Sequence, residues 1–189
     1  MIPTSRWTLP RVLRGMMLIA RGRPEGLNCF RDSPQAFFHS LLPGISLVVS
    51  ALIESLLEGS DNVMRDIPGT LCVLLAPAVL SYELARFWGR EAFWNRYVVA
   101  FNWCQWLFPL IGLTLLIVMT LAQSGAEVSQ GALRIIFIFM AFYALWLNWF
   151  LARHGLALSK WRAAALVVLV NLGTVAVAFG PTVLAQQFQ

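Results

Sequence analysis

Five long runs of apolar residues dominate the chain, and each is long enough to cross a bilayer as a helix. About 20 mainly apolar residues span the ~30 Å hydrocarbon core of a membrane. The runs cover residues 38–57, 67–88, 97–122, 131–151 and 161–185. Their apolar character is continuous, whereas a membrane β-strand alternates apolar and polar positions. The pattern therefore predicts five transmembrane helices joined by short loops.

Ahead of these runs, residues 9–20 repeat apolar positions with the period of an α-helix. The apolar face comprises Leu9, Val12, Leu13, Met16, Met17 and Ala20, and the opposite face carries Arg11, Arg14 and Arg21. This pattern predicts an amphipathic helix on the inner leaflet, with these arginines as lipid-headgroup contacts. A lead-in helix that packs on the bundle is a compatible alternative. Residues 22–26 end the helix, and Asp32-Ser33-Pro34 has the form of an N-cap with proline in the next helix's first turn.

Composition narrows the class of protein further. Of 189 residues, 59% are hydrophobic and 12% are charged, and the mean hydropathy is +0.70. Soluble domains are about 45–50% apolar and about 25% charged, so an ordinary soluble enzyme and a disordered chain are both excluded. The predicted fold class is an all-α polytopic membrane protein. It divides into an interfacial segment (1–37), a five-helix bundle (38–185) and a short external tail (186–189).

The distribution of basic residues predicts the orientation of the chain. The net charge is +5, from 14 Lys and Arg against 9 Asp and Glu. With five spans, all the basic residues except Arg65 and Arg134 fall on one side of the membrane. Because cytoplasmic loops carry an excess of Lys and Arg, the N-terminus is expected in the cytoplasm and the C-terminus outside. The chain is therefore predicted to be a multi-pass protein with its basic loops in the cytoplasm.

Polar side chains inside the predicted spans form the main candidate site, since each needs a partner in hydrocarbon. Six of them come from four spans and fall mostly in the inner half: Tyr82, Glu83, Asn102, Gln105, Asn148 and Asn171. They can line a cytoplasm-facing cavity that binds a polar solute or a lipid headgroup. Alternatively, they can simply join neighbouring helices through hydrogen bonds.

Two carboxylates near the outer end of the first span, Glu54 and Glu58, lie one helical turn apart. Such a pair suits a proton or cation site. Alternatively, the two carboxylates lie at the level of the lipid headgroups, or Glu54 pairs with Arg134 of the fourth span. The two histidines, His39 and His154, and the three scattered cysteines show no spacing typical of a cofactor or metal site. No nucleophile motif or phosphate-binding loop is present either. We therefore expect no catalytic residues, cofactor or metal, and no nucleic-acid partner.

Two sequence features resemble a known group of proteins. The stretches Ala20 to Gly26 (ARGRPEG) and Asp32 to Phe37 (DSPQAF), with the segment Tyr97 to Trp106, are similar to small bacterial inner-membrane proteins. The layout over residues 34–185 resembles the Yip1 family, which has five spans and a cytoplasmic N-terminus. The resemblance implies a non-catalytic protein that associates with lipid, with itself or with a larger membrane complex. A small transporter or channel subunit for a polar solute or ion is the alternative.

Overall fold

The computed structural model describes the backbone of residues 9–57, 63–122 and 130–187. Within these ranges the side chains at 47, 51–52, 54–56, 63–68, 122 and 181–187 are not described. The described chain contains helices and no strand, which confirms the all-α class. Its elements are α1 (Leu9–Ala20), η1 (Pro24–Cys29), α2 (Pro34–Leu57), α3 (Val63–Phe87), η2 (Glu91–Phe93), α4 (Trp94–Gln105), α5 (Leu107–Ala122), α6 (Gln130–Gly155) and α7 (Lys160–Gln187).

Four stretches of the described chain are long and apolar enough to cross a membrane. They are Gly69–Phe87, Glu91–Leu121, Gln130–Gly155 and Lys160–Gly180. These correspond to the second, third, fourth and fifth predicted spans. The first predicted span, 38–57, coincides with α2 but is not among the four.

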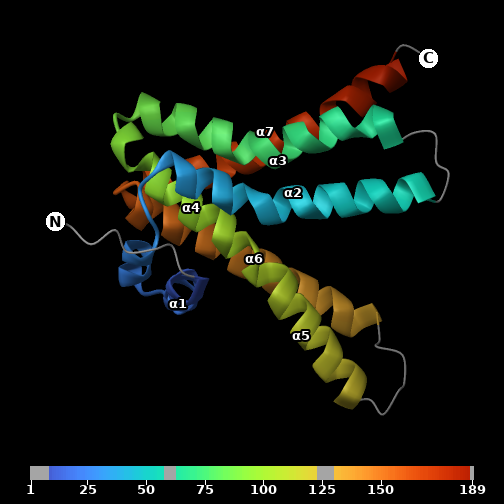
Figure 1. Ribbon diagram of the computed structural model, residues 1–189, viewed down its shortest axis with the longest axis horizontal. Coiled ribbons are helices and arrows are strands. Elements are labelled where there is room, and N and C mark those ends of the chain that lie inside the picture. The colour runs from blue at the N-terminus through green and yellow to red at the C-terminus, as the bar shows by residue number, and fades with distance from the viewer. Residues whose placement is uncertain (1–8, 58–62, 123–129, 188–189) are drawn as a thin grey trace.

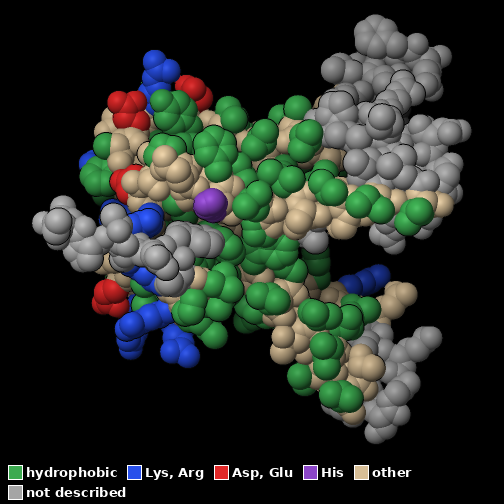
Figure 2. Space-filling view, in the orientation of Figure 1, with side chains coloured by type: hydrophobic (Ala, Val, Ile, Leu, Met, Phe, Trp, Pro, Cys, Tyr) green, Lys and Arg blue, Asp and Glu red, His purple; other side chains and the backbone are tan. Residues whose placement is uncertain are grey.

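The helices converge at one end of the molecule and separate into two arms at the other (Figure 1). The first arm consists of α2, α3 and α7. The second arm consists of α5 and the N-terminal half of α6. Charged side chains gather at the end where the helices converge (Figure 2). The packed core lies at that same end, around α4, which contacts α1, α2, α3 and α6.

The prolines within the spans have different effects. The third predicted span is divided at Trp106 into α4 and α5, and Pro109 lies in the first turn of α5. A proline removes the backbone N–H that would continue the helical ladder, which favours a break there. In contrast, α2 continues through Pro43 and α3 continues through Pro77. The break at Trp106 directs the second arm away from the first.

The start of α2 follows the predicted capping pattern. The Ser33 hydroxyl accepts a hydrogen bond from the backbone N–H of Ala36, at 3.3 Å, and Pro34 is the first residue of the helix. This bond satisfies one of the donors that a helix N-terminus leaves unpaired. The sequence therefore located the entry into α2 correctly.

The helix α1 packs against the protein on one of its faces. Val12, Gly15, Met16 and Ile19 are buried, and the Tyr143 hydroxyl on α6 donates to the Ala20 carbonyl at 2.9 Å. The apolar side chains of Leu9, Leu13 and Met17 form a separate exposed strip. The expected single apolar face is thus divided: Val12 and Met16 turn to the protein, whereas these three residues do not.

Candidate functional site

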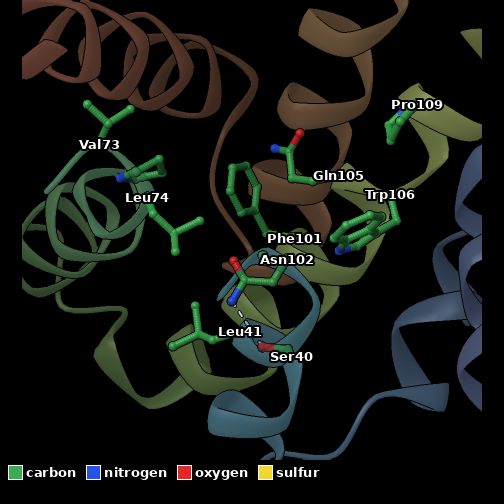
Figure 3. Close-up of a pocket in the computed structure, with 11 residues that line it drawn as sticks. Ser40, Leu41, Val73, Leu74, Phe101, Asn102, Gln105, Trp106 and Pro109 are labelled. Atoms are coloured by element: carbon green, nitrogen blue, oxygen red, sulfur yellow. Dashed lines mark hydrogen bonds between the residues drawn. The ribbon is translucent and has the colours of Figure 1, made fainter. Parts of the chain in front are cut away.

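A hydrogen bond joins α2 to α4 near the place where the two arms meet, which we call the fork. The Asn102 side-chain amide donates to the Ser40 hydroxyl at 2.9 Å (Figure 3). That hydroxyl donates in turn to the Phe37 carbonyl at 2.7 Å. Ser40 is buried, so the bond lies in a place that water does not readily reach. Hydrogen bonds of this kind join membrane helices at about 0.6–2 kcal/mol each. Asn102, one of the six candidate residues, therefore joins two helices through a hydrogen bond.

Beside this bond lies a cavity of about 430 Å³, which we call the fork cavity. Its polar lining consists of Ser40, Asn102 and Gln105. Its apolar lining is supplied by α2, α3, α4 and α5 (Figure 3), through Leu41, Gly44, Val73, Leu74, Pro77, Phe101, Trp106 and Pro109. No charged residue is among the described residues that line it.

A smaller cavity of about 230 Å³, the amide cavity, lies between α3, α4, α6 and α7. It brings together Gln105, Asn148 and Asn171, with Thr174 beside them. Pro77, Phe101 and Gln105 line both cavities and so form the wall between them.

The side-chain amides that line these cavities differ in whether they have a hydrogen-bond partner. The Asn171 side chain donates to the Val167 carbonyl at 2.7 Å, within its own helix. The side-chain amides of Gln105 and Asn148 form no hydrogen bond with another residue in the described part of the chain. Both side chains are half-buried, so each can still bond to an uncharged polar group that enters the cavity.

Tyr82 and Glu83 lie apart from the four amides, because both are exposed near the end of α3. The Tyr82 ring packs edge-on against Trp94, with centroids 5.1 Å apart, and neither residue lines the two cavities. The six candidates therefore form no single cluster: Asn102, Gln105, Asn148 and Asn171 occupy two adjoining cavities.

The other predicted site residues are three arginines near α1 and two carboxylates of the first predicted span. Arg11, Arg14 and Arg21 are exposed on and just after α1, and Arg11 Nη2 donates to the Asn28 carbonyl at 3.1 Å. Glu58 and the side chain of Glu54 lie outside the described residues.

Sequence reasoning missed Ser40, the partner of Asn102, and Thr174, which lines the amide cavity and donates to the Val170 carbonyl. A signal existed for Thr174, which is three residues after Asn171 and shares its helix face. Ser40 gave no such signal, since its bond partner lies 62 residues away.

The chemistry of both cavities is that of uncharged hydrogen bonding. Their polar groups are amides and hydroxyls, and no group of three His, Cys, Asp or Glu side chains that could hold a metal occurs among the described residues. No protein-family model, curated protein or solved structure matches this chain. The site itself is therefore the basis for assigning a role.

Proposed function

We propose that this chain is a non-catalytic, Yip1-like protein of the bacterial inner membrane that organises its surroundings by association. Its partners are membrane lipid, further copies of itself or a larger membrane complex. The observation that carries this proposal is the separation of the two arms. Helices that diverge at the fork leave apolar surfaces that other molecules must cover.

The second arm leaves a large apolar surface uncovered. Its exposed apolar side chains on α5 are Leu110, Leu113, Leu116, Ile117, Val118 and Leu121. Those on α6 are Leu133, Ile135, Phe137, Ile138, Phe139 and Phe142. The helix α5 packs mainly on α4 and α6. The exposed apolar side chains of α5 and α6 are therefore available to lipid or to a partner protein.

In this proposal α2 also crosses the membrane, as the first of five spans, and α1 lies on the inner leaflet. The exposed strip of Leu9, Leu13 and Met17 then enters the lipid, while Arg11 and Arg14 contact headgroups. The gathering of charged side chains at the end that holds α1 supports a cytoplasmic N-terminus (Figure 2). The far end of α7 lies at the opposite end of the molecule, as an odd number of spans requires (Figure 1).

A reporter fusion tests this topology directly. We expect a reporter active only outside the cytoplasm to be active after Gln189 and inactive when fused after Gly89, between α3 and α4. The reason is that five spans place these two points on opposite sides of the membrane. An inactive fusion after Gln189, or an active fusion after Gly89, would contradict the five-span arrangement.

Native mass spectrometry of the full chain, released gently from its membrane, tests association. We expect masses above that of the bare 21.1 kDa chain, from bound lipid, a second copy or another protein.

The alternative is a small transporter or channel subunit, which the amide cavity favours because its polar groups come from α4, α6 and α7. A bare chain that also speeds glycerol entry into vesicles would support that alternative against association.

A further inference from the structure

The fork cavity has three polar groups in a lining that is otherwise apolar. They are Ser40, Asn102 and Gln105 (Figure 3). Gly44 lies four residues after Ser40 on α2, and Pro109 on α5 lies four residues after Gln105, the last residue of α4. In the proposed topology the three polar groups therefore lie nearer the cytoplasm, at what we call the polar end, and Gly44 and Pro109 lie at the apolar end.

The polar end has hydrogen-bond donors to spare. Asn102 uses one amide hydrogen on Ser40 and keeps the other, and Gln105 has no partner among the described residues. With no charged side chain in the described lining, an ion or a charged solute would lose hydration without compensation. An uncharged hydrogen-bond acceptor fits these donors.

The apolar lining comes from helices of both arms, α2 and α3 on one side and α5 on the other, and these two arms diverge (Figure 1). The cavity volume of about 430 Å³ lies within the range of about 300–1,000 Å³ that is usual for small-molecule sites. A molecule that enters between the arms comes from the bilayer, and it must carry a long apolar part to cover the wall.

We infer that the fork cavity binds one acyl chain of an ester lipid from the surrounding bilayer. The ester carbonyl accepts hydrogen bonds from the Asn102 and Gln105 amides, and the chain lies along Leu41, Leu74 and Pro109. This inference rests on the proposed lipid association and gives it a specific site.

Photo-crosslinking of the full chain in vesicles tests the site. The vesicles contain phosphatidylethanolamine and phosphatidylglycerol, with a small fraction of phosphatidylcholine whose acyl chain carries a diazirine. We expect cross-links at Leu41 and Leu74 to exceed those on the lipid-facing surface of α7, at Val168 and Leu172. Cross-links on α7 but not in the cavity would overturn this inference and leave lipid association intact, whereas absence at both places would overturn both.

A pair of glycine variants sharpens the result. In Gly44→Phe the ring enters the cavity, where a Cβ would already lie 3.1 Å from Leu74 Cδ1. We expect about a tenfold loss of the cavity cross-links and no change on α7. The control Gly112→Phe adds the same ring on α5, where no atom lies within 4 Å of the added Cβ, and should leave the cavity cross-links unchanged. Equal losses in the two variants would contradict the site.

Competition tests the polar end and does not require a bulky change. A monoacylglycerol should displace the photoactivatable lipid better than an alkane of the same chain length. In Gln105→Leu this preference should fall by about three- to tenfold, because one hydrogen bond is lost. Asn148→Leu, the same kind of change at a residue that lines only the amide cavity, should preserve it. An unchanged preference in Gln105→Leu would overturn the role of the amide.

Discussion

Replacing Leu151 with alanine is expected to lower the free energy of unfolding by about 2–4 kcal/mol. Leu151 lies near the C-terminal end of α6 and has no exposed surface. It belongs to the core at the convergent end, together with Leu147 and Tyr97. Because lipid tails are as apolar as leucine, the loss comes from packing contacts and from the cavity left behind. Unfolding of the chain in mixed micelles, followed by circular dichroism, measures it.

The matched control is Leu172→Ala on α7. The Leu172 side chain is 62% exposed, so its loss removes few protein contacts. We expect a change in the free energy of unfolding below about 1 kcal/mol. A cost at Leu151 no greater than that at Leu172 would show that the convergent end is not the stabilising core.

The second large effect is expected at Gly26, where η1 crosses α1. A Cβ added there would lie 2.7 Å from the Gly15 carbonyl oxygen and 2.8 Å from Ile19 Cγ1. Since the oxygen belongs to the backbone of α1, the two elements must separate, and Gly26→Ala should lose about 1–3 kcal/mol of stability. The connection between them carries the exposed residues Arg21 and Arg23, so trypsin should cut the variant there faster than the unaltered chain.

Gly112→Ala serves as the control for Gly26→Ala. Gly112 lies inside α5, and a Cβ added there meets no atom within 4 Å. Alanine is a better helix former than glycine, so this variant should be as stable as the unaltered chain or more so. If trypsin cut both variants at the same rate, the close crossing of α1 and η1 would not be what holds this segment.

Hydrophobic pattern alone was sufficient to predict most of the helices. The ranges 67–88, 131–151 and 161–185 each correspond to one helix of the structure, and the cap at Ser33 was placed correctly. These features depend on residues close together in the chain: continuous apolarity requires a helix in lipid, and a serine before a proline suits a helix start. The short helix η1 was not predicted, since its packing on α1 depends on contacts at Gly15 and Gly26.

The candidate site, like the fold, could be predicted only where it depends on local sequence. The sequence singled out Asn102, Gln105, Asn148 and Asn171 because polar groups in a span need partners. It gave no means of telling that Tyr82 and Glu83 lie apart from them, since depth in the membrane does not specify which face of α3 meets the other helices. That face was decided by packing.

For this protein, the sequence determined the helical class, the approximate ends of the spans and the concentration of basic residues beyond one end of them. All of these follow from local chemistry, namely the cost of exposing polar backbone to hydrocarbon and of burying charge. Only the tertiary structure decided that the third span divides at Trp106 while α2 and α3 continue through their prolines, and that the resulting fork encloses a cavity beside Asn102 and Gln105. The physical reason is that a helix can bend or remain straight at proline at similar cost, and contacts with distant segments select between the two.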